Sequence, residues 1–85
     1  MIALYDSLSG IIYIQLESKG KIHHTTEFNP ETVLELDQND QLVGIEMIKP
    51  SRLILSRIAK KYQRAELGRL NLETLQKSID YKPLF

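Results

Sequence analysis

Four basic side chains recur at helical spacing in the last third of the sequence: Arg57, Lys60, Lys61 and Arg64. Residues three and four apart are neighbours on a helix surface, so these side chains would form one basic face. Such a face can contact the phosphates of a nucleic acid, with binding that weakens steeply with salt. It can also pair with an acidic surface of another subunit or partner, or simply face solvent. We therefore treat the four residues as a candidate interaction face.

The other reactive side chains give little indication of catalysis. His23 and His24 are adjacent, and neighbours on a strand point to opposite faces, so we do not expect them to share a metal ion. Tyr5, Asp6 and Glu46 could form a proton-transfer set, but we favour the structural explanation, in which the Tyr5 ring packs on the sheet and Asp6 caps a turn. The sequence has no cysteine, its four glycines are scattered, and no serine occupies a nucleophile elbow. We expect a protein that is not an enzyme, without catalytic residue, metal site or cofactor.

The formal net charge of zero conceals a strong asymmetry along the chain. Residues 1–48 carry eight acidic and two basic side chains, a net charge of −6, whereas residues 49–69 carry seven basic side chains and one acidic, a net charge of +6. Asymmetry of this kind points to partners. No apolar run approaches the ~20 residues needed to cross a bilayer, and no signal peptide is visible. We expect no membrane association and a cytoplasmic location.

The first half of the sequence shows the period of two that is typical of strands. Residues 2–6, 11–16 and 21–28 are predicted strands, and the third, which is the most polar, is expected at a sheet edge. Residues 32–48 form a predicted hairpin with a polar turn at residues 38–41. Gly44 lies in the middle of its second strand, so we expect a bulge there or the close passage of a helix. The predicted core face of the hairpin comprises Leu34, Leu36, Val43, Ile45 and Met47.

After Pro50 the apolar period becomes that of a helix. Ser51 is the expected N-cap of a long amphipathic helix over residues 52–67, which Gly68 would end. Asn71 is the expected N-cap of a shorter helix. Together these segments predict one α+β domain over residues 1–85. It consists of an antiparallel sheet of four to five strands in a hairpin meander (2–48), a helical part (51–80) and a tail (81–85).

Three segments of the sheet region resemble a bacterial and archaeal family. They are Tyr5-Asp6, then Ile12-Tyr13-Ile14-Gln15-Leu16, then Leu36-Asp37 followed by Leu42-Val43-Gly44-Ile45-Glu46-Met47. In this order, over about residues 2–50, they are similar to the domain of unknown function 2283. Gln41 stands where that family usually has a turn glycine. The resemblance implies a small antiparallel sheet with helical decoration and no assigned catalytic residue, and it allows an antitoxin role.

The small size of the chain adds a final expectation about function. A chain of 85 residues buries only about 60–65% of its unfolded surface, so its core is thin and association is expected. We therefore expect a non-enzymatic protein–protein interaction module that self-associates, as a homodimer, with a further protein partner possible. The alternative is a nucleic-acid-binding or antitoxin-like regulator that uses the basic helix face. It is less favoured because the second helix, which should enter the groove, carries Glu73 and Asp80 against Lys77 alone.

Overall fold

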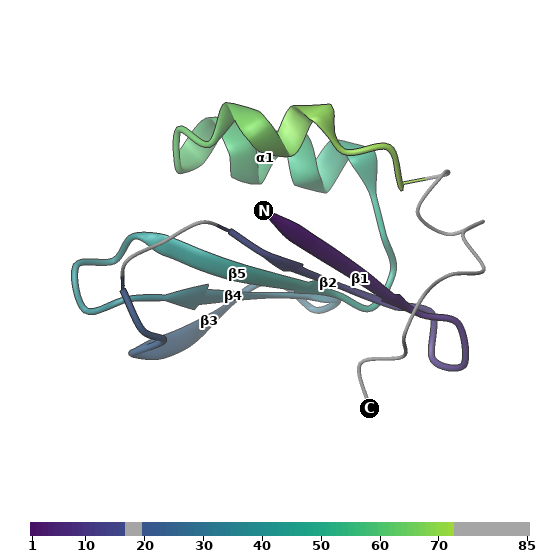
Figure 1. The fold of residues 1–85 in the computed structure, drawn as a ribbon, viewed down its shortest axis with the longest axis horizontal. Helices are drawn as coiled ribbons and strands as arrows, with labels where there is room; N and C mark the ends of the chain where they lie inside the picture. Colours follow the sequence, from purple (N-terminus) through teal and green to yellow (C-terminus); the bar gives the residue numbers. More distant parts are fainter. Residues whose placement is uncertain (17–19, 73–85) are drawn as a thin grey trace.

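The protein folds into one antiparallel sheet with a helical layer on one side. The computed structural model describes residues 1–16 and 20–72. The elements in chain order are β1 (Ile2–Asp6), β2 (Ile11–Gln15), β3 (His24–Asn29), β4 (Thr32–Leu36), β5 (Leu42–Met47), α1 (Arg52–Lys61) and the 3-10 helix η1 (Ala65–Arg69). Figure 1 shows the two layers, with α1 above the sheet. The predicted α+β class and the antiparallel sheet are confirmed.

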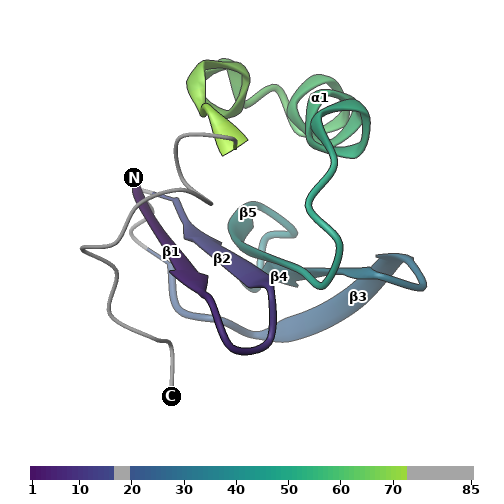
Figure 2. The same ribbon diagram turned by 90° about the vertical axis from the view of Figure 1, so that its right-hand side faces the viewer.

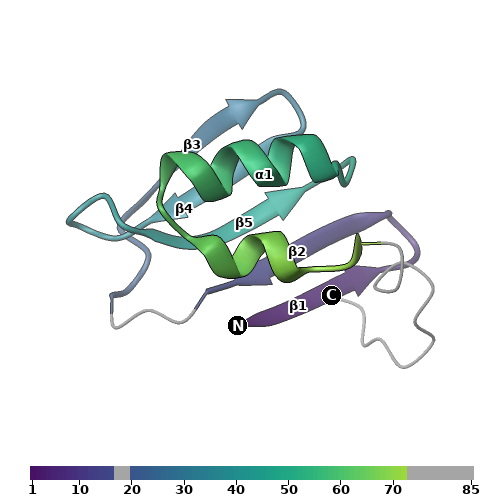
Figure 3. The same ribbon diagram turned by 90° about the horizontal axis from the view of Figure 1, so that it is seen from above.

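The strand order differs from that of a simple meander. It is β1-β2-β5-β4-β3, and every neighbouring pair is antiparallel. The chain forms the hairpin β1–β2, crosses to the far edge, and returns through β3 and β4 to insert β5 beside β2 (Figure 3). The two outer strands are therefore β1 and β3. The prediction that the polar third strand lies at an edge is confirmed, although this strand begins at His24 and not at Lys21.

Alternate side chains of the central strands form the core beneath the helical layer. Helices α1 and η1 lie side by side over the same face of the sheet (Figures 2 and 3). The period of two places every second residue toward this layer, where apolar side chains lose contact with water. Of the predicted core residues of the hairpin, Leu34, Leu36, Ile45 and Met47 belong to this core, as do Ile12, Ile14 and Leu16. Val43 is also buried, but Leu42 occupies the core in its place, beside the register irregularity between β4 and β5. The layer contributes Leu55, Ile58 and Leu67.

Helix α1 begins where the sequence predicts and ends earlier. The Ile54 N–H donates to the Ser51 side chain at 3.3 Å, so Ser51 is the N-cap. The predicted end at residue 67 is wrong, because the helix stops at Lys61. Gln63 takes a left-handed conformation with φ of 55°, and the Arg64 N–H bonds to the Ala59 carbonyl at 2.9 Å. This is the Schellman arrangement, in which the left-handed position is usually glycine. Because glutamine occupies it here, the helix end lacks its usual signal in the sequence.

The chain after this turn reverses onto the sheet. The 3-10 helix η1 carries Leu67, which is fully buried, so the reversal adds an apolar side chain to a thin core. A helix continued to residue 67 would place Ala65 on its apolar stripe, but Ala65 is exposed. Leu72 is buried. The remainder of the predicted second helix, residues 73–80, and the predicted tail over residues 81–85 lie outside the described residues.

Two aspartates fix the hairpin turns that frame the sheet. Asp6 accepts from the Leu8 N–H at 3.0 Å and from the Ser9 hydroxyl at 2.8 Å, which confirms its predicted capping role. These two hydrogen bonds lower the pKa of Asp6, because they favour the ionised carboxylate. Asp37 accepts from the Asn39 and Gln41 N–H groups at 2.8 and 3.0 Å. The polar turn after β4 is therefore confirmed, with Asp40 left-handed at φ 60°.

Candidate interaction surfaces

A tyrosine from β2 reaches across β5 to a glutamate of β4. The Tyr13 hydroxyl donates to Glu35 Oε1 at 2.5 Å, over the strand that separates them. Gly44 lies at the crossing point, opposite Glu35 in the register of β4 and β5. A Cβ atom on Gly44 would lie 2.9 Å from the Tyr13 hydroxyl and would overlap the Glu35 carboxylate. The crossing therefore requires glycine at this position.

This crossing revises the explanation predicted for the mid-strand glycine. The expected close approach to Gly44 is confirmed, but the groups that approach are side chains on the face opposite α1, and not the helix. An irregularity in the register of β4 and β5 also occurs beside it, between Glu35 and Leu36. In the sequence, Tyr13 is visible as an aromatic residue on the face of β2 opposite the core residues Ile12 and Ile14. The register that places Glu35 across Gly44 could not be read without the strand order.

The Tyr13 hydroxyl is held in its protonated form. Burial raises the pKa of Tyr13 to about 12, and the hydrogen bond to Glu35 and the negative charges of Glu35 and Glu46 act in the same direction. Glu46 lies opposite Tyr13 in the register of β2 and β5. A phenol with this pKa donates hydrogen bonds at neutral pH and is a poor general base. The cluster is suited to holding a carboxylate in place and not to proton abstraction.

No described helix or strand covers this side of the sheet (Figure 1). The five strands contain no lysine or arginine, so the charged side chains that the strands place on this surface are acidic. The cross-strand register places alternate strand residues on it. We name this surface the open face, and its principal members are Ile2, Leu4, Ile11, Tyr13, Val33, Glu27, Glu35 and Glu46.

The basic residues predicted from the sequence lie mainly on the opposite side of the molecule. Helix α1 contains four basic residues and no acidic ones. Arg57 and Lys60 are exposed on the side of α1 that faces away from the sheet, together with Leu53, which is 62% exposed. We name these three residues the outer face of α1. Lys61 is exposed at the flank of the helix, where its Nζ lies 6.0 Å from the ring centre of Phe28.

Arg64 does not lie on this helix. It follows the turn that ends α1, and its guanidinium donates to the Glu66 carboxylate and, at 3.2 Å, to the Leu42 carbonyl. The same interaction lowers the pKa of Glu66, because the guanidinium donates a hydrogen bond to the carboxylate. The predicted position of Arg64 beside the other three residues is therefore wrong. Its side chain attaches the turn to β5, so the helical part of the candidate face consists of Arg57, Lys60 and Lys61.

The two histidines belong to different hollows beside β3. Their rings are in edge-to-face contact, with centres 5.6 Å apart. The expected alternation of side chains between the two faces of a strand does not apply to this pair, because His23 precedes the start of β3. His24 Nε2 lies 3.2 Å from Asp40 Oδ1 at the end of a groove of about 510 Å³ between β3 and α1. Within residues 1–16 and 20–72, no three histidine or acidic side chains are grouped to hold a metal ion.

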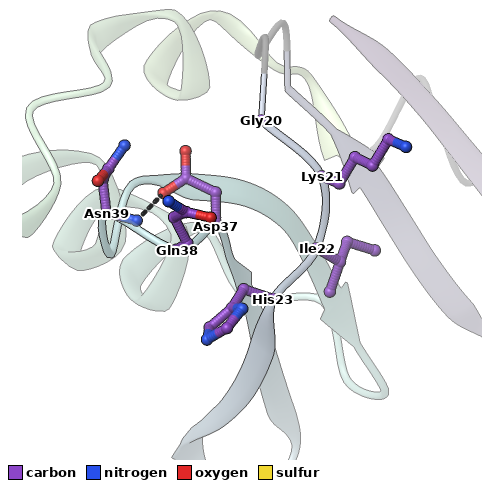
Figure 4. A pocket seen from close by; sticks show the side chains of 7 residues that line it. All are labelled: Gly20, Lys21, Ile22, His23, Asp37, Gln38 and Asn39. Carbon is purple, nitrogen blue, oxygen red and sulfur yellow. Dashed lines mark hydrogen bonds between the residues drawn. The ribbon is translucent and has the colours of Figure 1, made fainter.

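His23 lines a second hollow, between the chain entering β3 and the turn after β4. Figure 4 shows its walls, with the hydrogen bond from Asn39 to the Asp37 carboxylate on one side. A Cβ atom on Gly20 would lie 2.7 Å from Asp37 Cβ, so the two segments are in close contact here. Asp37 already accepts two turn amides, so its carboxylate is used in holding the turn.

The predicted proton-transfer set is separated by the register. Tyr5 pairs with Ile12 and packs against the core beneath the helical layer. Glu46 pairs with Tyr13 and belongs to the open face. Asp6 is used in its turn. The three residues therefore do not form one site, and the packing and capping interpretation of Tyr5 and Asp6 is confirmed.

The fold and its surfaces define a small two-layer α+β domain with one sheet face open. A family model described as protein of unknown function (DUF2283) matches residues 3–51, more than half of the chain, and the chain belongs to that family. No curated protein matches it, and no solved structure does. The matched residues include Tyr13, Glu35 and Gly44 and end just before α1. Within the described parts of the chain, no helix has the length and apolar character needed to cross a membrane.

Proposed function

We propose that this protein is a non-enzymatic protein–protein interaction module that self-associates, with a homodimer as its smallest assembly. The supporting observation is the arrangement of charge: an open sheet face on which the described strands place only acidic charged side chains, and a basic helix on the other side of the same small domain. Apolar side chains accompany both, since Ile2 is 55% exposed and Leu53 is 62% exposed. Surfaces that combine apolar groups with charge are suited to binding proteins.

Light scattering coupled to size exclusion tests this proposal. At low ionic strength and rising protein concentration, the measured mass should increase above the 9.8 kDa of one chain. High salt should return it toward that value, because charges at an exposed surface are screened. A mass that stays at one chain at every concentration and salt level would contradict self-association.

The basic helix also supports a second candidate, a nucleic-acid-binding or antitoxin-like regulator. Three of the four predicted cations are exposed on or beside one helix face, without an acidic residue in α1. Titration of labelled duplex DNA and RNA at low and moderate salt separates the two candidates. Binding that weakens with salt and is lost in the Lys60→Glu/Lys61→Glu variant favours the regulator. Absence of binding at low salt removes it. A cytoplasmic location stays a prediction.

A further inference from the structure

We propose that the open face of one molecule binds the outer face of α1 of a second copy, so that the molecules associate head to tail. This inference rests on the proposed self-association and names the two surfaces that make it. It follows from three properties of the described residues: the signs of the charges, the dimensions of the two faces, and their placement on opposite sides of the domain.

The signs of the charges select one orientation of two copies. The open face carries Glu27, Glu35 and Glu46, and the strands contribute no basic side chain. Helix α1 carries four basic side chains and no acidic one. Two open faces placed together would oppose glutamates, and two helices placed together would oppose cations, both of which are unfavourable. Only a contact between helix and sheet brings opposite charges together.

The Tyr13–Glu35 pair prepares one acceptor for this contact. The Tyr13 hydroxyl binds Oε1 of Glu35 and so restricts the orientation of the carboxylate. Oε2 of the same group can then accept from an incoming guanidinium or ammonium. An oriented acceptor loses less side-chain entropy on binding than a mobile one. Arg57 is the exposed arginine of the outer face, and a guanidinium is the donor best suited to a fixed carboxylate.

The dimensions of the two faces also agree. The ten residues of α1 extend for about 15 Å. The strands, with five or six residues each, extend for roughly 17–20 Å. Five strands at a spacing of ~4.8 Å span about 19 Å between the outer two. A single ten-residue helix laid on this surface would bury less than the ~1,200 Å² of stable interfaces. We therefore expect weak, reversible association at high protein concentration.

The placement of the faces determines the form of the assembly. Because the two faces lie on opposite sides of each molecule, one contact leaves an unused open face at one end and an unused helix at the other (Figure 1). A contact between two different surfaces closes only if its rotation generates a ring. A homodimer is then the first product, and the average mass should continue to rise with concentration.

Paired charge reversals test the inference by sedimentation velocity at low salt. The sheet-reversed variant is Glu27→Lys/Glu46→Lys, and the helix-reversed variant is Arg57→Glu/Lys60→Glu. Each variant alone presents two faces of like sign and should be monomeric under conditions in which the wild type associates. An equal mixture of the two variants again pairs opposite charges and should regain association. A variant with all four reversals should associate like the wild type.

A control separates position from total charge. The Lys21→Glu/Lys49→Glu variant changes the net charge by the same amount as the helix-reversed variant, at residues outside both faces, and should associate normally. Circular dichroism of every variant checks that it is folded. If the wild type associates and the helix-reversed variant associates equally well, this inference is wrong while self-association stands. If the wild type is monomeric throughout, both proposals are wrong.

Discussion

At the scale of single residues, Gly44 is the position on which the open face depends. Its missing side chain leaves the space in which Tyr13 and Glu35 meet across β5. Burial and the hydrogen bond to Glu35 keep the Tyr13 hydroxyl protonated, and the same hydrogen bond orients one of the three glutamates of the open face. Substitution of Gly44 should therefore affect stability and the surface together.

We expect Gly44→Ala to lower the free energy of unfolding by about 1–3 kcal/mol, because the added methyl group displaces the Glu35 carboxylate and the Tyr13 hydroxyl. Urea denaturation measures this change. Gly68→Ala is the matched control, since a Cβ atom there meets nothing within 4 Å, and it should be neutral or slightly stabilising. In a Glu35→Ala background the cost of Gly44→Ala should decrease. An equal cost in both backgrounds would contradict this explanation.

Tyr13 should titrate near pH 12, measured as the difference in absorbance at alkaline pH between the wild type and Tyr13→Phe. Its folded pKa is raised above the ordinary value of 10.0, so its contribution to stability is complete below pH 10. That contribution should be lost as the pH rises through about 12, while Tyr13→Phe lacks this component of the pH dependence. A Tyr13 that ionises near pH 10 would show that its hydroxyl is neither buried nor bonded to Glu35 in solution.

At the scale of elements, the sequence predicts the strands, their buried faces, turn capping by Asp6, the polar turn after β4 and the start of α1. These features depend on local chemistry: alternation over five or six residues, short polar turn residues, and a serine cap. The early end of α1 was missed because Gln63 occupies the left-handed position where glycine is the usual signal. The insertion of β5 beside β2 was missed because hairpin patterns specify neighbours along the chain and not partners across a crossover.

The same limit explains what was missed at the candidate site. The sequence singles out Gly44 and contains Tyr13 within the family motif, but their meeting with Glu35 depends on the order β2-β5-β4. Arg64 was assigned to the basic face only because the helix was extended past Lys61. The charge asymmetry of the sequence, in contrast, carries over directly to the molecule, since the five described strands lie within the acidic segment 1–48 and α1 lies within the basic segment 49–69.

The cap of α1 should contribute measurably to the stability of the helical layer. Ser51→Ala removes the acceptor for the Ile54 N–H and should cost about 1 kcal/mol of unfolding free energy. Ser56→Ala is the control, because Ser56 is exposed within the same helix and its loss should stay within about 0.5 kcal/mol. Thermal or urea denaturation of the two variants compares them. Equal effects would indicate that the serine cap is not formed in solution.

At the scale of the whole molecule, the account depends on two surfaces of opposite sign on the two sides of a thin domain. Each surface alone has an ordinary explanation, since exposed helices are often basic and open sheet faces often polar. Their combination in one chain distinguishes head-to-tail association from association through a single shared surface. Head-to-tail association should change the environment of two surfaces as the protein concentration rises, whereas association through a single shared surface should change only one.

A dilution series of amide NMR spectra at low salt measures most directly how many surfaces respond to concentration. We expect concentration-dependent shifts in two separate groups, one on α1 around Arg57 and Lys60, the other on the central strands around Tyr13, Glu35 and Glu46. Both groups should lose their concentration dependence at high salt, because the contact pairs exposed charges. Shifts confined to one of the two surfaces, or the absence of any concentration dependence, would contradict the account.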